Sequence, residues 1–224
     1  MNLRTFLVAG AALVFSTAAN AVVLVQTLDA GFYNDSIGTV LNLHDGGEAG
    51  PFPVTTDGTV SFPTAPNLSP AASILGNWLV DPAHLNSNWS FETSIPGNWA
   101  VGTEVAIIYR FDTLAATNVV ASFGVDNGIF AWLDGTYLFG ARAGGGAFLG
   151  EYTLNLGNLA AGSHYLQLLL EDHGGSNGYA VSITADTFIP GPPPSEMSEP
   201  AMLGLFGIGL AGLGFAALRR RAKR

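Results

Sequence analysis

The amino-acid sequence predicts an all-β protein with one β-sandwich domain, an N-terminal signal peptide and one C-terminal transmembrane helix. Three observations predict this organisation. Apolar residues alternate with polar ones along much of the central region, which is typical of strands with one buried face. Segments rich in Gly, Asn, Ser, Thr and Pro separate these stretches, and an apolar run lies near each end of the chain. We therefore assign residues 22–188 to the sandwich domain.

Residues 1–21 have the features of a signal peptide. Arg4 supplies a positive charge, residues 6–15 form a short apolar core, and Ala19-Asn20-Ala21 is a small-x-small cleavage site. An N-terminal transmembrane helix is the alternative, but the apolar core is short and the cleavage site follows it directly. We expect export through the inner membrane and a mature chain that begins at Val22.

Composition narrows the classes of function. The chain has no cysteine, which excludes disulfides, thiol catalysis and thiolate metal sites. Between residues 22 and 195 there are 15 acidic residues and two basic ones, Arg110 and Arg142, a net charge of −13 with neutral histidines. Such a surface repels phosphate groups, so we expect neither nucleic acid nor anionic membrane as a partner of this domain.

The first half of the domain has weaker strand signals than the second. Residues 22–28 predict a first strand, and short strands are expected at 38–43 and 59–62 among loops rich in Gly and Pro. Residues 74–80 and 88–95 are also strand-like, and each stretch carries a tryptophan.

The second half shows clear alternation. In 103–113, the side chains of Val105, Ile107, Tyr109 and Phe111 share one face, and 119–125 alternates in the same way. Asp126-Asn127-Gly128 and Asp134-Gly135 predict tight turns, because Asn, Asp and Gly tolerate positive φ. The remaining alternating stretches are 129–133, 137–139, 152–156, 166–170 and 179–183. Short strands separated by turns at this spacing predict a sandwich.

Residues 189–224 have the composition of a membrane attachment. Residues 189–197 are a proline-rich linker that favours an extended conformation. Residues 201–218 are uncharged, glycine-rich and apolar, and their 18 residues are enough to cross a bilayer as a helix. The positive charges of the tail 219–224 would keep that end in the cytoplasm. They belong to Arg219, Arg220, Arg221, Lys223 and Arg224.

This C-terminal segment, residues 198–224, resembles the sorting signal of PEP-CTERM proteins. Glu199 and Pro200 match the end of the Pro-Glu-Pro motif, Ser198 stands at its first proline, and a Gly-rich helix and a basic cluster follow. The resemblance implies processing by an exosortase-like enzyme in a Gram-negative bacterium that makes exopolysaccharide. It also implies membrane anchoring first, then a location at the cell surface, outside the cell or in a biofilm. An ordinary C-terminal anchor is the alternative.

The segment 123–165 resembles PA14-like and galactose-binding-like jelly rolls. The resemblance is carried by Phe123-x-Val125-Asp126-Asn127-Gly128, by Trp132-Leu133-Asp134-Gly135 and by Leu159-x-Ala161-Gly162-Ser163-His164-Tyr165. It implies a jelly-roll-like form of the sandwich. PA14-like members often have two aspartates where this chain has Asp126-Asn127.

Aromatic and polar residues of the same region suggest carbohydrate binding. The faces of Trp132 and Tyr137 suit the apolar face of a sugar ring, and Asp126, Asn127 and Asp134 could bind its hydroxyl groups. The alternative is that these rings, like those of Trp78, Trp89 and Trp99, fill the core. Because Trp132 alternates with Phe130, we expect at least one of the two to point away from Ile129 and Leu133.

No cofactor is required by any motif. Calcium would need six to eight oxygen ligands gathered from several loops. The acidic residues in Gly-rich turns are Asp45, Glu48, Asp126, Asp134 and Asp172. We expect turn-forming aspartates and no cofactor, and a calcium site is the alternative.

Catalytic motifs are also missing, so we expect a non-catalytic protein. The densest titratable group, Glu171-Asp172-His173, is predicted to be split between the two faces of a strand. We expect a surface or matrix protein with exopolysaccharide as a partner. A membrane-retained glycosidase or other hydrolase and a purely structural matrix protein are the alternatives.

Overall fold

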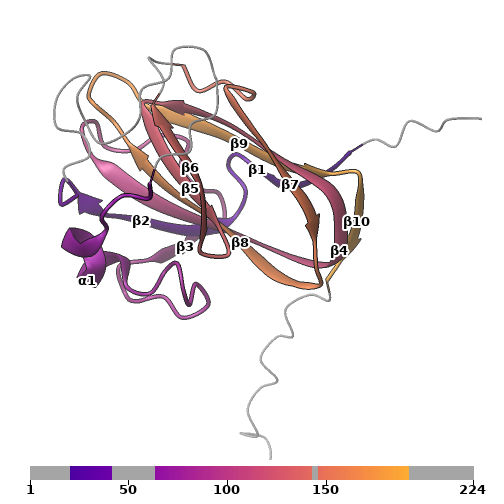
Figure 1. Cartoon of the computed structure of the whole chain (residues 1–224). Helices are drawn as coiled ribbons and strands as arrows, with labels where there is room; N and C mark the ends of the chain where they lie inside the picture. Colours follow the sequence, from indigo (N-terminus) through magenta and orange to yellow (C-terminus); the bar gives the residue numbers. More distant parts are fainter. Residues whose placement is uncertain (1–20, 42–63, 143–145, 192–224) are drawn as a thin grey trace, which may run out of the picture.

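The computed structural model describes residues 21–41, 64–142 and 146–191. In these residues, antiparallel strands form two layers that pack face to face, which confirms the all-β sandwich (Figure 1). The strands are β1 (Val22–Gln26), β2 (Gly31–Gly38), β3 (Ser90–Glu92), β4 (Glu104–Asp126), β5 (Gly128–Leu133), β6 (Thr136–Arg142), β7 (Tyr152–Leu159), β8 (Gly162–Glu171), β9 (Gly178–Ala185) and β10 (Thr187–Pro190). The main order is β1-β9-β4-β8-β5-β6; β2, β7 and β10 pair with further parts of β4, and β3 pairs with β2.

Strand β4 belongs to both layers because it runs for 23 residues. Its first part pairs with β8 and β2, its later part pairs with β7 and β9, and β10 lies beside its middle. The prediction of separate strands at 103–113 and 119–125 is wrong. The structure has one strand with a register shift at Asn118, whose φ is +50°. The intervening residues contain neither glycine nor proline, so the strand bends there without breaking.

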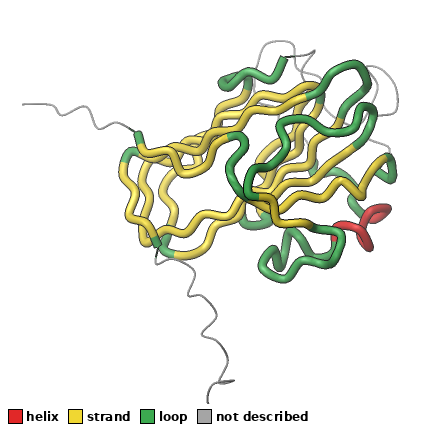
Figure 2. The backbone as a smooth tube through the Cα atoms, turned by 180° about the vertical axis from the view of Figure 1, so that it is seen from behind, coloured by secondary structure: helices red, strands yellow, loops and turns green. Residues whose placement is uncertain are grey.

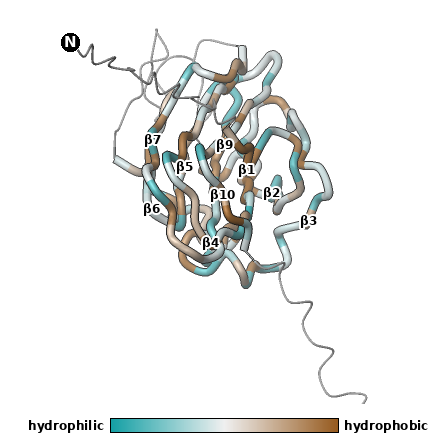
Figure 3. Tube along the Cα trace, turned by 90° about the vertical axis from the view of Figure 1, so that its right-hand side faces the viewer, coloured by the Kyte–Doolittle hydropathy of each residue, from teal (hydrophilic) through white to brown (hydrophobic). Residues whose placement is uncertain are grey.

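The main core lies between the two layers. On β4, the side chains of Val105, Ile107 and Tyr109 point into this core, as their alternation predicted. The hydroxyl groups of Tyr109 and Tyr179 lie 2.5 Å apart and join β4 to β9 inside it. Figure 3 shows the hydrophobic and hydrophilic stretches that alternate along the strands. Burial of these side chains is the main source of stability for such a fold.

A second core lies on the outer face of the layer that contains β5 and β8. The covering segment, residues 65–89, includes a turn of 3-10 helix, η1 (Ser69–Ala71), and the short helix α1 (Ala72–Leu75) (Figures 1 and 2). The buried residues of this core are Ile37, Ala71, Leu75, Trp78, Trp89, Ala106, Ile108, Phe130, Trp132 and Leu169. The strand predicted at 74–80 is wrong. Gly76, with φ +62°, ends the helix, and the apolar residues here cover a sheet.

Strand boundaries near the two ends also differ from the predictions. A strand was predicted to begin at residue 38. The structure instead has β2 at Gly31–Gly38, so a strand ends at this residue. The polar Asn34 resembles a turn residue, yet it is 1% exposed and donates a hydrogen bond to the Ile74 carbonyl oxygen. Strand β3 falls within the predicted stretch 88–95. Strand β10 extends to Pro190, so its last two residues fall inside the range predicted for the linker.

The predicted signal peptide up to residue 20, the strand at 59–62, the helix at 201–218 and the basic tail lie outside the described residues. Within the part of the chain that the structure describes, no helix is long and apolar enough to cross a bilayer. The chain enters the sandwich at β1 and leaves it after β10. Both points lie at the end of the sandwich that is remote from α1 (Figures 1 and 2).

Candidate functional site

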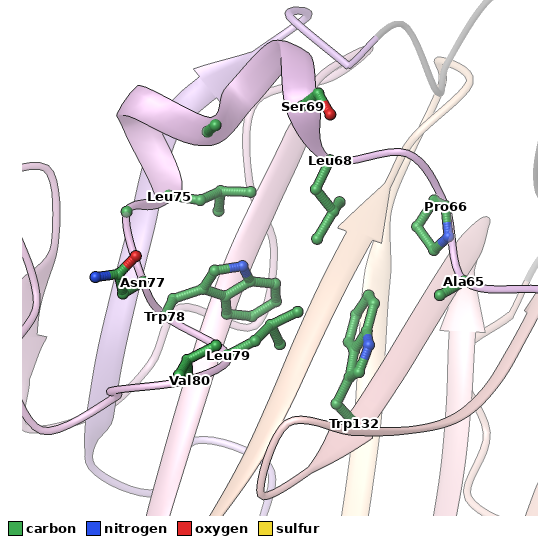
Figure 4. A pocket seen from close by; sticks show the side chains of 12 residues that line it. Ala65, Pro66, Leu68, Ser69, Leu75, Asn77, Trp78, Leu79, Val80 and Trp132 are labelled. Carbon is green, nitrogen blue, oxygen red and sulfur yellow. The ribbon is translucent and has the colours of Figure 1, made fainter.

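A pocket of about 390 Å³ opens between the covering segment and β5 (Figure 4). Its walls include Leu68, Leu75, Trp78, Leu79 and Trp132. Among the described residues, those that line it carry no charge, and Ser69 and Asn77 contribute a hydroxyl and an amide side chain. The volume falls within the range of small-molecule sites, which are mostly apolar with a few polar groups.

Two tryptophans from distant parts of the chain form the aromatic part of the pocket. The ring centroids of Trp78 and Trp132 lie 5.4 Å apart with an interplanar angle of 70°. Trp89 stacks on Trp78 from behind, with centroids 5.7 Å apart, and so supports that wall. Trp132 and Phe130 both point away from Ile129 and Leu133, as expected for at least one of the pair. The covering segment leaves Trp132 only 2% exposed.

The indole N–H groups differ in their hydrogen bonds. Those of Trp89 and Trp99 donate to the carbonyl oxygens of Leu75 and Thr103, at 3.1 and 2.9 Å. Among residues 21–41, 64–142 and 146–191, the indole groups of Trp78 and Trp132 have no such acceptor.

Tyr137 belongs to the aromatic group around the pocket but lies behind it. It pairs with Trp132 across β5 and β6, and the two ring centroids are 5.5 Å apart at 62°. Its hydroxyl group is buried without a hydrogen bond to any described residue, and burial raises the pKa of Tyr137 to about 12. The structure thus places Tyr137 where it supports Trp132.

Gln167 connects the pocket to the β5–β6 turn. Its side chain is fully buried, and its amide nitrogen donates to the Trp78 carbonyl oxygen at 2.6 Å. Its amide oxygen accepts from the Gly135 N–H at 2.8 Å. Gln167 was not predicted to belong to the site. A polar residue within the apolar run of β8 is the signal that could have found it.

Asp134 shapes the predicted Asp134-Gly135 turn. One carboxylate oxygen lies 2.7 Å from His164 Nδ1, and the other accepts from the Tyr165 N–H at 2.8 Å. Both carboxylate oxygens thus contact other groups of the protein, and Asp134 does not line the pocket.

Asp126 and Asn127 lie at the other end of β5. The six residues of that strand separate them from Asp134 by roughly 20 Å. Asn127 donates to the Asp126 carboxylate at 2.9 Å and accepts from the His173 N–H at 2.9 Å. The five residues predicted to bind a ligand therefore do not form one site. Trp132 lines the pocket, Tyr137 and Asp134 lie next to its walls, and the other two are remote.

A buried group of ionisable residues lies near Asp126. Glu104 and Glu171 pair across β4 and β8, and both are fully buried. His173 Nε2 lies 3.2 Å from a Glu171 carboxylate oxygen and 3.1 Å from Arg142 Nη1. Glu171-Asp172-His173 was predicted to be split between the two faces of a strand, but β8 ends at Glu171, so Asp172 and His173 lie beyond the strand and His173 contacts Glu171. Burial raises the pKa of Glu171 to about 8.

These acidic residues do not gather into a metal centre or an open carboxylate pair. Among the described residues, no three His, Asp or Glu side chains are grouped as metal ligands, and Asp45 and Glu48 lie outside this part of the chain. The Glu104–Glu171 pair is closed to solvent, so a glycoside cannot reach it in this structure. His164 cannot activate Ser163, because its Nε2 faces the Ala160 carbonyl oxygen at 3.0 Å.

No family model matches the chain, and no curated protein sequence is significantly similar to it. Among solved structures, it is similar to the PA14 domain of the antifreeze protein MpAFP. The two are 15% identical over 80% of this chain and 92% of that one, with a TM-score of 0.32. A likeness of this extent carries no information about ligand or activity.

Proposed function

We propose that this protein is an exported surface or extracellular-matrix component that binds carbohydrate without catalysing a reaction. The site is the pocket between the covering segment and β5, and its ligand is a neutral saccharide of an exopolysaccharide. The observation that carries the proposal is the pair of tryptophans in an uncharged pocket. The sandwich is of the jelly-roll kind, and its role is to hold this pocket in place.

The chemistry of the pocket favours a neutral saccharide over other small ligands. Indole rings offer flat apolar faces, which suit the axial C–H groups of a pyranose. The indole N–H groups of Trp78 and Trp132 have no acceptor among the described residues, and with Ser69 and Asn77 they can bind ring oxygens and hydroxyl groups. In the part of the chain that the structure describes, the lining has no basic side chain to attract an anion and no acidic one to attract a cation.

The position of the pocket fits attachment at the C-terminus. The chain leaves the sandwich after β10, whereas α1 and the pocket lie toward the opposite end (Figures 1 and 4). A proline-rich linker and a helix at 201–218 would therefore hold the domain on the inner membrane with the pocket directed away from the bilayer. Exosortase-like processing near Glu199 would then release the domain to the cell surface or the matrix.

Binding to a glycan array and to exopolysaccharide tests the proposal. We expect full-length protein in mild detergent to retain a neutral glycan, and Trp132→Ala to abolish retention. Because Trp132 is buried, the variant must first show the circular dichroism spectrum of the folded wild type. Retention unchanged in the folded variant would contradict the pocket as the site. No binding to any glycan would leave a purely structural matrix role.

A further inference from the structure

The ring of His164 has an oxygen acceptor at each nitrogen. Nδ1 lies 2.7 Å from an Asp134 carboxylate oxygen, and Nε2 lies 3.0 Å from the Ala160 carbonyl oxygen. A neutral imidazole carries one N–H, so both contacts are hydrogen bonds only when the ring is protonated and positively charged. In the neutral ring, one nitrogen lone pair would face an oxygen atom.

The groups around His164 favour the charged ring. On β4, the Asp112 carboxylate lies near it, and that carboxylate is paired with Arg110 at 3.0 Å and bonded to Ser163. Asp134 lies on the β5–β6 turn, and the Ala160 carbonyl oxygen belongs to the link between β7 and β8. Burial lowers the pKa of His164, but the bonds to Ala160 and Asp134 and the two carboxylate charges outweigh it, so this pKa is raised.

The turn held by His164 is also the support of the pocket. Asp134 is bonded to Tyr165 through both its carboxylate and its main-chain N–H. The next residue, Gly135, donates to Gln167, which in turn holds the Trp78 carbonyl oxygen. Trp132 lies two residues before Asp134, where the β5–β6 register shifts. Both indole walls thus depend on this turn.

We propose that His164 and Asp134 form a pH-sensitive latch for the Trp78–Trp132 pocket. With the charged ring bound to Asp134, the turn is fixed and the indole walls are in place. When the ring loses its proton at higher pH, the turn loosens and the pocket binds its ligand more weakly. The part of this inference that concerns the ligand rests on the carbohydrate-binding function proposed above, whereas the movement of the indoles does not.

The latch is tested first without any ligand. In full-length protein labelled at its tryptophans with a stable nitrogen isotope, NMR follows the indole N–H resonances of Trp78 and Trp132 from pH 5.5 to pH 9. We expect both to shift with a common midpoint above the ordinary pKa of histidine, about 6.5. The shift is lost in His164→Gln, and its midpoint moves to lower pH in Asp134→Asn. His84→Gln, which removes an exposed histidine, leaves it unchanged.

Two results of the NMR experiment overturn the latch. One is a pair of indole resonances that do not titrate, and the other is a titration that persists in His164→Gln. If His164→Gln fails to fold, an unmoved midpoint in Asp134→Asn overturns it equally. These outcomes do not depend on whether the pocket binds sugar.

Binding is then measured by calorimetry with a β-linked glucose hexamer, whose flat faces suit indole rings. Loss of one charged hydrogen bond predicts about tenfold weaker binding at pH 9 than at pH 6. The affinity of His164→Gln is expected to be the same at both pH values. Equal wild-type affinities at the two pH values overturn the latch. No binding at either pH counts against the proposed function, and the NMR titration then decides on the latch alone.

Discussion

The side-chain amide nitrogen of Gln167 lies 2.6 Å from the main-chain oxygen of Trp78, a residue 89 positions earlier in the chain. This hydrogen bond joins the covering segment to the centre of the sheet. The same side chain also accepts from the Gly135 N–H, so one buried amide joins three parts of the chain. The pocket exists because these parts are held together.

Replacing Gln167 with Leu should therefore destabilise the protein. The Trp78 carbonyl and the Gly135 N–H would be left without partners, at a cost of about 1–3 kcal/mol each in the free energy of unfolding. Urea unfolding followed by circular dichroism measures the loss. The matched variant Gln26→Leu changes an exposed glutamine and should alter the stability by less than about 0.5 kcal/mol. Equal stabilities of the two variants would contradict the role of Gln167.

Gly135→Ala should disturb the pocket as well as the turn. Gly135 has φ +74°, and a Cβ atom there would lie 2.3 Å from the Leu79 carbonyl oxygen in the pocket wall. Gly150→Ala is the matched control, because Gly150 also has positive φ, +99°, but no atom within 4 Å of the added carbon.

Both alanine variants bear a backbone strain of about 1–2 kcal/mol, and only Gly135→Ala also displaces Leu79. We expect a clearly lower thermal midpoint for Gly135→Ala than for Gly150→Ala. The same midpoint in both would show that the turn does not press on the pocket wall.

The raised pKa of Glu171 predicts a loss of stability as the pH rises. The unfolded chain releases this proton near pH 4.5, whereas burial lets the folded chain keep it until about pH 8. Between these values the folded state binds more protons, so the free energy of unfolding falls as pH increases and levels off above pH 8. The raised pKa of His164 acts in the same direction, since its stabilising charge is lost as pH rises through the folded value.

Glu171→Gln separates the two effects, because glutamine does not ionise. We expect thermal unfolding between pH 5 and pH 9 to show a shallower decline in this variant than in the wild type. Glu92→Gln, at the edge strand β3, should keep the wild-type slope. A wild-type midpoint that rises from pH 5 to pH 8 would contradict the buried neutral carboxyl.

Processing at the C-terminus makes a separate prediction. Mass spectrometry of protein from the culture supernatant should show chains that begin at Val22 and lack the residues after Glu199. The membrane fraction should contain the unprocessed C-terminus. Arg224 present in every fraction would rule out processing and leave the ordinary anchor.

The fold could be predicted where the signals are local. Alternation and the Asp-Gly turn placed β5, β6, β8 and β9 correctly, because a strand with one buried face and a tight hairpin depend on neighbouring residues. The bend at Asn118 could not be predicted, since no local breaker marks it. The covering segment was missed because its apolar residues pack on a distant sheet face, although Ala106 and Ile108 already showed that this face is apolar.

Only part of the site could be predicted, because its residues come from distant parts of the chain. Trp132 was recognised from its own strand, but its partner Trp78 comes from a segment whose position depends on tertiary packing. Asp126 and Asp134 are close in sequence, yet β5 holds them at opposite ends. Residues that are close in sequence along an extended strand lie far apart in space, so these two carboxylates do not share a site.

In the proposed function, the Trp78–Trp132 pocket binds a neutral saccharide. Val80 lines the pocket and is 89% exposed, so Val80→Arg places a large charged group at the opening with little effect on stability. Val101→Arg makes the same change at an exposed position, 57% exposed, that does not line the pocket.

The most direct test is the affinity of full-length wild type, Val80→Arg and Val101→Arg for a glycan retained on the array. We predict that Val80→Arg weakens binding by at least about tenfold, a change of about 1.4 kcal/mol, and that Val101→Arg matches the wild type. Equal affinities of all three proteins would contradict the pocket as the binding site.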